Sequence, residues 1–421
     1  MKKKTKIQPN RRDTTVLRQI CQLIPTHLVA KLARETGADE KARTFSPWSH
    51  VVAMLYAQLS HALSLNDVCD ALRLRLTPLF GIRAATPPAK NTLSHANRER
   101  DCLMAEKLFW AQLEHLQLAF PQFTRGRGKR KFGWRFKRAI HAVDSTTIQL
   151  VANCMDWAKH RRRKAAAKCH LRLDLQSFLP KFAIVDTARE HDNKRAREVC
   201  AGLYEGEIVI FDKAYVDFAH LWDLAKRGIF WVSRAKENLA CRVKKRLPRP
   251  SDRRILKDEL IVLKGHKSRQ AYPEVLRRVT ALVEVDGQER VMVFLTNNLE
   301  WAASSVVDLY GCRWDIEVFF KELKQTVQLV DFLGHSANAV KWQVWTALLV
   351  HLLLRFLAWQ SRWAHSFSRL VTYLRAALWL ERNINDLLKR CGTADGDFRC
   401  LGSPEQAWLP GFARDAMGQP G

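Results

Sequence analysis

The sequence predicts an α/β fold: a mixed sheet with flanking helices, preceded by a helical domain and followed by further helices. Apolar residues recur at helical spacing over residues 14–119, strand-like runs separated by helices fill 139–233, and helical spacing resumes after residue 301. The chain has 421 residues, so several domains are expected at the usual ~150 residues per domain. Its 47% hydrophobic and 27% charged content excludes a disordered or fibrous chain.

The first 122 residues are predicted to form a helical domain. Val51, Leu55 and Leu59 illustrate the helical spacing of its apolar residues. We expect five or six short helices between residues 14 and 119. Taken alone, this segment fits a plain helical domain whose basic residues are solvated.

Two basic runs flank the first predicted strand. Residues 123–138 form a basic linker without an acid, and residues 159–164 form a second run of the same sign. A solvated charge run is the simpler interpretation, but two such runs favour contact with phosphates. The candidates for phosphate contact here are Arg130, Lys131, Arg161, Arg162 and Arg163.

A sheet with helices is predicted over residues 139–233, as the first part of a core. The predicted strands cover residues 139–143, 168–175, 182–186, 207–211 and 229–233, and the helices cover 193–201 and 218–226. The turn at Pro180 favours antiparallel pairing of the early strands, and the later helices favour parallel strands.

A β-rich insertion is predicted over residues 234–300, where Asp286-Gly287 marks a hairpin. The segment 301–330 is predicted to return to the core as one long helix, from about residue 302 to 327. C-terminal helices follow over residues 331–391, with 344–359 buried, and the tail 392–421 is predicted to be loose.

The charge balance indicates a polyanionic partner. Seventy lysines and arginines against 42 acids give a net charge of +28, so nucleic acid is the first candidate. We expect no membrane span, since the apolar stretch 344–354 is interrupted by His351 and is shorter than the ~20 residues required. The basic start lacks the apolar region of an export signal, and the ten scattered cysteines fit a reduced compartment, so a cytoplasmic location is expected.

Two aspartates are candidates for a metal site. Asp144 and Asp212 each follow an apolar strand, and ligands in open α/β sheets gather at the carboxyl ends of strands. Converging carboxylates bind Mg²⁺. For either residue alone, a salt-bridged or turn-capping aspartate is an equal alternative, and a third ligand would decide.

The predicted helix 302–327 supplies candidates for that third ligand. At about 100° per residue, one polar stripe of this helix contains Tyr310, Arg313, Glu317 and Lys324. A separate apolar stripe faces the core and contains Ile316, Phe319, Phe320 and Leu323. Asp315 and Glu322 lie off the polar stripe, so Glu317 is the favoured carboxylate. The alternative is an exposed face with i,i+4 charge pairs.

These residues resemble a known family. The spacing Tyr310-x2-Arg313-x3-Glu317-x6-Lys324 resembles the Tyr-Arg-Glu-Lys signature of bacterial insertion-sequence transposases of the Asp-Asp-Glu (DDE) type, which cut and paste DNA through hairpin ends. The residues around Asp144 and Asp212 resemble the first and second acidic motifs of that family. The resemblance extends from residue 12 to about 388. It implies a ribonuclease-H-like core with a β-rich insertion, and an N-terminal domain that binds the DNA ends.

The resemblance also implies roles for residues. Asp144, Asp212 and Glu317 would be catalytic and would hold two Mg²⁺ ions, with Mn²⁺ as a substitute. Tyr310, Arg313 and Lys324 would bind DNA phosphates. The implied partners are double-stranded DNA, as the terminal inverted repeats of the element and as the target, and a second copy of the chain on paired DNA ends. The implied location is the bacterial nucleoid.

One departure from the family concerns base flipping. Some relatives stack a flipped base on a tryptophan of the insertion, but residues 239–300 contain none, and only Trp231 and Trp301 flank them. We expect that either flanking ring could serve. Two alternative functions stay open: a ribonuclease-H-like endonuclease without strand transfer, and a non-catalytic DNA-binding regulator.

Overall fold

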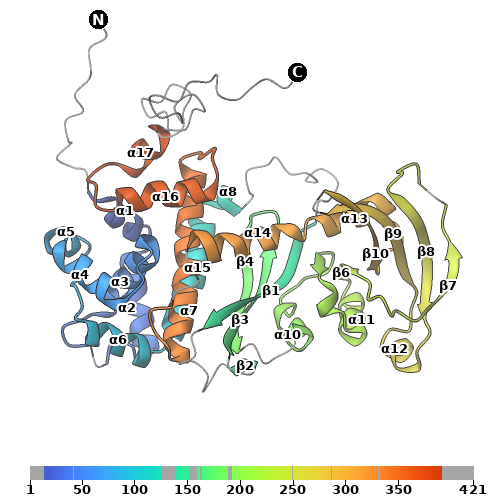
Figure 1. The fold of residues 1–421 in the computed structure, drawn as a ribbon, viewed down its shortest axis with the longest axis horizontal. Coiled ribbons are helices and arrows are strands. Elements are labelled where there is room, and N and C mark those ends of the chain that lie inside the picture. Colours follow the sequence, from blue (N-terminus) through green and yellow to red (C-terminus); the bar gives the residue numbers. More distant parts are fainter. Residues whose placement is uncertain are drawn as a thin grey trace, which may run out of the picture.

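The computed structural model describes residues 14–390 except 41, 125–135, 137, 151–158, 162–163, 188–191, 249, 286, 328 and 330–331. One mixed sheet forms the centre of the fold, and a bundle of helices lies beside its first strands (Figure 1). The predicted mixed α/β class is confirmed. Most of the predicted linker 123–138 and the predicted tail 392–421 lie outside the described residues.

Short helices make up the described N-terminal segment. Up to residue 119 they are α1 (Val16–Gln22), α2 (Thr26–Glu35), α3 (Pro47–Ser60), α4 (Leu65–Leu74), α5 (Leu76–Phe80), α6 (Lys90–Glu99) and α7 (Leu103–Ala119), and α8 (Pro121–Thr124) follows. The expectation of five or six helices up to that residue was therefore too low. One apolar run is split, because the backbone of Arg75 leaves helical geometry (φ −118°, ψ 37°) and separates α4 from α5.

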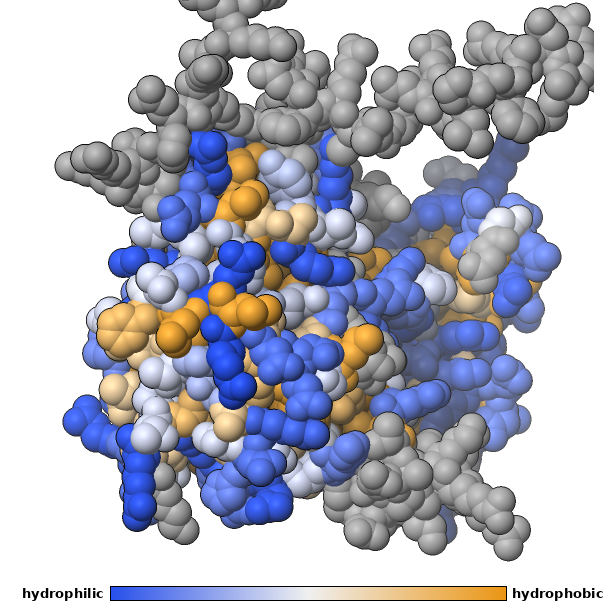
Figure 2. All heavy atoms as spheres, turned by 60° about the vertical axis from the view of Figure 1, so that its left-hand side comes forward, coloured by the Kyte–Doolittle hydropathy of each residue, from blue (hydrophilic) through white to orange (hydrophobic). Residues whose placement is uncertain are grey.

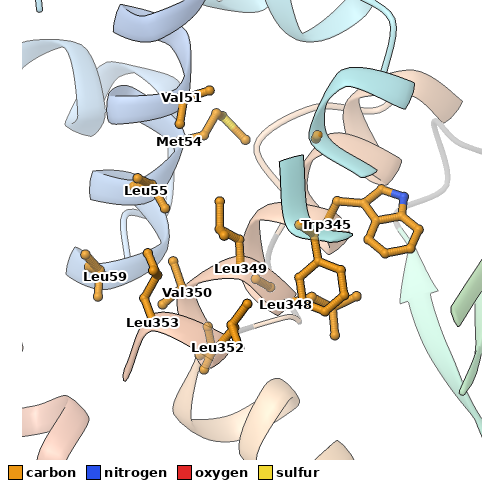
Figure 3. Close-up of a cluster of buried hydrophobic side chains, with 14 of the residues drawn as sticks. Val51, Met54, Leu55, Leu59, Trp345, Leu348, Leu349, Val350, Leu352 and Leu353 are labelled. Atoms are coloured by element: carbon orange, nitrogen blue, oxygen red, sulfur yellow. The ribbon is translucent and has the colours of Figure 1, made fainter. Parts of the chain in front are cut away.

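A long C-terminal helix, α15 (Ala337–Gln360), forms the centre of this bundle. Some of its apolar side chains point toward α3 in Figure 3, where Leu349 and Leu353 lie opposite Leu55 and Leu59. Two shorter helices follow, α16 (Phe367–Ala377) and α17 (Ile384–Arg390). The first and last described helices thus share one core.

The expectation that no apolar segment is long enough to span a membrane was wrong for α15. The helix has 24 residues and passes a length and composition test for a span, because His351 lies within it without ending the helix. However, 83% of its most apolar window is buried inside the protein. This burial is typical of the core helix of a globular domain.

The central strands run parallel and antiparallel to one another as predicted. They are β1 (Ile140–Leu150), β2 (Lys159–Arg161), β3 (Lys164–Asp174), β4 (Leu179–Thr187), β5 (Ile208–Phe211) and β6 (Phe230–Arg234), with α10 (Asp192–Val199) and α11 (Phe218–Lys226) between the later ones. β3 pairs antiparallel with β1 and β4, whereas β1, β5 and β6 are parallel. The predicted antiparallel pairing of the early strands, followed by parallel strands, is confirmed.

β1 is longer than predicted. We expected it to end at residue 143, but it continues to Leu150 because β3 pairs with it as far as Leu150↔Ala165. Its parallel pairing with β5 does end at Val143↔Phe211. Asp144 therefore lies within a strand, at the point where the parallel neighbour stops.

The insertion extends the central sheet. It contains β7 (Cys241–Arg246), β8 (Ile255–Leu263), α12 (His266–Ala271), β9 (Leu276–Val285) and β10 (Gln288–Thr296). β9 and β10 form the predicted hairpin, and Gly287 in its turn has φ 73°, which glycine adopts without strain. Because β10 pairs with β6, one ten-stranded sheet runs through the core and the insertion.

The predicted helix 302–327 is not continuous. It is divided into α13 (Ala303–Gly311), α14 (Trp314–Lys321) and a π-helical segment, η3 (Glu322–Thr326). Cys312 N–H and Arg313 N–H donate to carbonyls three residues back, at 3.1 and 3.0 Å, so the chain tightens into a 3₁₀ turn there. Gly311, a weak helix former, precedes this turn.

Candidate active site

Asp144 and Asp212 are neighbours across the parallel pair β1 and β5. The register Val143↔Phe211 puts the two aspartates one step further along adjacent strands, which lie ~4.8 Å apart. Side chains alternate along a strand, so both point to the face on which Ile140 and Ile210 pack under α13. The sheet brings these two carboxylates together.

Arg313 joins the first aspartate to the glutamate of α14. Its guanidinium lies 3.2 Å from the Asp144 carboxylate and 2.5 Å from the Glu317 carboxylate. Arg313 is 11% exposed and Glu317 is 38% exposed, so the glutamate faces solvent at the site and not the protein interior. The predicted apolar stripe of the same helix is buried, as expected.

The 3₁₀ turn before α14 aligns Arg313 with Tyr310. Residues three apart eclipse each other in such a turn, and the guanidinium carbon lies 5.7 Å from the centre of the tyrosine ring. Burial raises the pKa of Tyr310 to about 12, and Asp212 adds to this increase while Arg313 opposes it. The hydroxyl therefore stays protonated at neutral pH, as a donor to an anion must.

Lys324 belongs to the π-helical segment and reaches β1. Its ammonium donates to the carbonyl of Thr147 at 2.8 Å. Burial lowers the pKa of this lysine. Tyr310, Arg313 and Lys324 thus lie toward the sheet, and the half-exposed Glu317 joins them through Arg313.

The electrostatics of the site centre on Asp144. Burial raises its pKa to about 6; the Ser145 N–H and Arg313 oppose the increase, and Asp212 and Glu317 add to it. Negative charge at this position is therefore only partly neutralised by the protein. A cation at the site would relieve it.

The donor set suits a hard divalent cation, because it consists of carboxylates with an unrelieved negative charge. Within the described part of the chain, however, no three acidic, histidine or cysteine side chains stand close enough to enclose a metal ion. Arg313 bonds to two of the carboxylates instead.

Other acids of the same region are engaged elsewhere. Asp308 pairs with Arg254 at 3.0 Å, and Glu322 bonds to His351 at 2.8 Å and to Arg355 at 2.5 Å on α15. Asp315 is exposed to solvent. Helical geometry placed Asp315 and Glu322 off the polar stripe, and the structure directs Glu322 to α15.

Most of the candidates for phosphate contact in the two basic runs lie outside the described residues. Arg130, Lys131, Arg162 and Arg163 are not among the described residues, and only the backbone of Arg161, in β2, is described. Their predicted phosphate contacts stay predictions.

The two flanking tryptophans are not equivalent. Trp231 is fully buried in β6, so the expectation that it could stack a base was wrong. Trp301 packs against Phe136 and Phe230. A third tryptophan, Trp314, was not among the expected residues; it is 45% exposed and lies 5.4 Å from the Arg313 guanidinium. Its position directly after Arg313 was the available signal.

A comparison with protein families shows that the chain is an enzyme that acts on DNA. The family model of the transposase DDE domain matches residues 135–353, just over half of the chain, which includes Asp144, Asp212 and Glu317. The chain therefore belongs to the DDE transposases of bacterial insertion sequences. A second model, a domain of unknown function (DUF4372), matches residues 12–80.

Several relatives carry transposase names. The probable transposase of insertion sequence element IS5377 from Geobacillus stearothermophilus is 26% identical over 83% of this chain and 87% of its own length. A Sinorhizobium fredii protein named "Putative transposase y4zB" is 29% identical over 58% of this chain and 68% of its own length. Among solved structures, a piggyBac transposase synaptic complex with hairpin DNA aligns over 93% of this chain and 84% of that chain, with a TM-score of 0.45 and 11% identity.

Proposed function

We propose that this transposase excises its element by metal-dependent strand cleavage through a hairpin and inserts it into target DNA, with Asp144, Asp212 and Glu317 as the catalytic residues. The observation that carries the proposal is the arrangement of these carboxylates. Two adjacent strands bring the aspartates together, and Arg313 ties Glu317 to the same face.

The three carboxylates would hold two divalent ions, Mg²⁺ or Mn²⁺. When bound, such ions activate a nucleophile and offset charge on the leaving oxygen. The chain itself supplies the groups that orient the DNA. Arg313 turns from the carboxylates to a phosphate of the element end, because a bidentate arginine–phosphate contact is strong. The Tyr310 hydroxyl and the Lys324 ammonium bind neighbouring phosphates.

The reaction then proceeds as a series of phosphoryl transfers at one site. Water attacks the phosphodiester at the element end and releases a 3′-hydroxyl. This hydroxyl attacks the opposite strand, displaces its 3′-oxygen and closes a hairpin. A second water reopens the hairpin, and the freed 3′-hydroxyl attacks a target phosphodiester.

The architecture supports two further parts of the proposal. The strand order β4-β3-β1-β5-β6, with β1, β5 and β6 parallel, supports a ribonuclease-H-like core. The Tyr310, Arg313, Glu317 and Lys324 set supports the Tyr-Arg-Glu-Lys subgroup. Because both element ends must be cut together, the active species is a homodimer on paired double-stranded ends.

The test uses a supercoiled donor plasmid that carries the gene with its flanking DNA, and a target plasmid. With Mg²⁺, the wild-type chain is expected to give hairpin-ended fragments on a denaturing gel, followed by insertion products. Asp212→Asn and Glu317→Gln should abolish both while retaining DNA binding. Asp315→Asn, on the same helix but off the site, is the matched control and should cleave normally.

The same assay separates the alternatives. Cleavage without hairpins or insertion products would identify an endonuclease. Binding without any cleavage, in both wild type and Glu317→Gln, would identify a non-catalytic regulator. Loss of cleavage in Asp315→Asn to the same degree as in Glu317→Gln would remove the special role of Glu317.

A further inference from the structure

Arg234 lies at the end of β6, at the level of the two aspartates of the candidate active site. The pairing of β5 with β6 stops at Phe211↔Ser233, so Asp212 and Arg234 each lie one step beyond it. In the same way, Asp144 lies one step beyond the pairing of β1 with β5. Three adjacent parallel strands therefore carry charged side chains at one level, in the order Asp144, Asp212 and Arg234.

The side chain of Arg234 points to the same face of the sheet as the aspartates. Arg234 is paired directly with Phe294 of β10, and directly paired residues of antiparallel strands share a face. Phe294 is buried on the face covered by α13, and its ring centre lies 4.9 Å from that of Tyr310. Asp212 points to this face too, because its backbone is still extended (φ −72°, ψ 160°) and side chains alternate along an extended chain. Arg234, Asp212 and Tyr310 thus share one side of the sheet.

The Tyr310 hydroxyl lies near charges from two different elements. Burial raises the pKa of Tyr310 to about 12, Asp212 adds to the increase, and Arg313 and Arg234 oppose it. Arg313 belongs to the turn before α14, whereas Arg234 belongs to the sheet. The two arginines therefore lie near one hydroxyl but come from different parts of the fold.

The guanidinium of Arg234 is the available cation of this region. Arg313 is held by two carboxylates of the site. Lys213 and Lys236 follow β5 and β6; the first lies 3.8 Å from a glutamate and the second donates to a backbone carbonyl at 3.1 Å. Of these four cations, Arg234 alone has neither an ion pair nor a side-chain hydrogen bond to any residue that the structure describes.

A solvated surface arginine is the simpler interpretation of Arg234. Hydrophilic side chains cover much of the face shown in Figure 2, so an exposed cation by itself indicates no function in this protein. Arg234 differs because it is partly buried between β5 and β10, at the level of the aspartates. Partial burial removes hydration from the cation, and no described acid compensates for that loss. A phosphate of bound DNA would do so through a charge-assisted hydrogen bond.

We infer that Arg234 is a further substrate-binding residue of the site and holds the DNA on the side of the attacked phosphate that lies away from the element end. Arg313 contacts Asp144 at one end of the row, and Arg234 lies at the other end, beyond Asp212. In the proposed reaction Arg313 holds the element end. Arg234 therefore contacts the flanking DNA during cleavage and the target DNA during strand transfer. The inference rests on the proposed function, in which one site receives these two DNAs in turn.

The test uses the full-length chain with Mg²⁺ and a pre-cleaved duplex, which ends at the element terminus with a free 3′-hydroxyl, so that strand transfer needs no prior cleavage. Insertion into a target plasmid is measured at increasing plasmid concentration. Arg234→Ala should raise the half-saturating target concentration by roughly 10- to 100-fold, the effect of losing one hydrogen bond to a charged group. The rate at saturating target should change less than about threefold, because Arg234 binds DNA and takes no part in the bond changes.

Three further measurements separate contact with DNA from a structural role. Arg234→Lys keeps the charge and should recover part of the affinity for the target. Arg197→Ala changes an exposed arginine of α10, on the opposite face of the sheet, and should behave like the wild type. Arg234→Ala should bind the pre-cleaved duplex as tightly as the wild type in fluorescence anisotropy, which also shows that the variant is folded.

The inference is overturned if Arg234→Ala keeps the wild-type dependence on target concentration. It is also overturned if this variant loses affinity for the pre-cleaved duplex to the same degree, or if Arg197→Ala has the same effect. Failure of the proposed function gives a different result, because the wild type then yields no insertion product at any target concentration.

In that case a binding measurement decides the inference without any chemistry. It uses the Glu317→Gln background, in which the DNA stays intact. A duplex that extends from the element terminus into flanking DNA should bind more tightly than the pre-cleaved duplex, and Arg234→Ala should remove most of this difference. An equal difference with and without Arg234→Ala, or no difference at all, overturns the inference.

Discussion

A single arginine offsets the charge of the candidate active site. Arg313 contacts Asp144 and Glu317, while Asp212 directly follows the neighbouring parallel strand β5. Burial is the main reason that the pKa of Asp144 rises to about 6, and the two neighbouring carboxylates add to it. The site is therefore electrostatically strained without a cation, as functional sites often are.

This strain predicts that removal of the Asp144 charge stabilises the metal-free protein. The folded pKa of about 6 exceeds the unfolded value of ~3.9, so the folded state binds the proton more tightly between these values. The contribution of Asp144 to the free energy of unfolding therefore falls as the pH rises from ~4 to 6, and it stays low at higher pH. Asp144→Asn should raise the free energy of unfolding by about 1–3 kcal/mol at pH 7.5 and change it little at pH 4.

Urea denaturation in EDTA at the two pH values measures this difference. Asp315→Asn, on the exposed side of α14, should show no comparable gain. Equal stability of Asp144→Asn and the wild type at pH 7.5 would contradict the assigned burial of the charge. Asp144→Asn should also lose all cleavage, because the proposed chemistry requires the carboxylate of Asp144.

A second prediction concerns competition between Arg313 and divalent ions. Because the guanidinium occupies the Asp144 and Glu317 oxygens, Arg313→Ala should bind Mn²⁺ roughly tenfold more tightly than the wild type in the absence of DNA. The increase of the melting temperature with Mn²⁺ concentration measures this affinity. The double variant Asp212→Asn with Arg313→Ala should lose this increase in Mn²⁺ affinity. An identical Mn²⁺ dependence in wild type and Arg313→Ala would argue against competition.

At the scale of elements, two departures from regular helix build the site. The 3₁₀ turn at Cys312 and Arg313 brings the guanidinium over Tyr310, and the π-helical segment η3 directs Lys324 to β1. A regular-helix projection identified which residues share a face, because both segments keep right-handed helical backbone. It missed the breaks, since they depend on hydrogen bonds that packing selects.

The core contact between α3 and α15 provides a prediction at this scale. Leu353 is fully buried in that contact (Figure 3), so Leu353→Ala should lower the free energy of unfolding by roughly 2–5 kcal/mol through a cavity. Chemical denaturation checks this. Leu380→Ala is the control, because Leu380 is 52% exposed and should change stability by less than about 0.5 kcal/mol. A small effect of Leu353→Ala would show that α15 is not central to the bundle.

At the scale of the molecule, the charge of +28 is the dominant property. DNA binding should weaken steeply with salt, by a log–log slope near −0.9 for each neutralised phosphate. A duplex titrated between 50 and 200 mM NaCl should lose roughly 10³- to 10⁵-fold in affinity if six to ten phosphates are contacted. Fluorescence anisotropy measures the slope. A flat response would contradict electrostatic binding.

The continuity of the sheet could not be predicted from sequence. The insertion strands were predicted as a separate β-rich segment, and the hairpin around Gly287 is local enough to be recognised from Asp-Gly. The pairing of β10 with β6 joins residues about 60 positions apart, as in Thr296↔Val232. No local pattern encodes such pairing, because strand partners are chosen by the packing of the whole sheet.

Sequence alone located most of the elements and the candidate site residues. Apolar spacing located the strands before Asp144 and Asp212, and the spacing of Tyr310, Arg313 and Glu317 identified the polar face of a helix. Those signals are local, since they depend on the geometry of one strand or one helix. Tertiary structure alone decided that Asp144 lies within a longer strand, that Arg313 occupies the carboxylates, and that α15 connects α6 to the glutamate helix. These features depend on contacts between distant segments, and packing of the folded chain sets them.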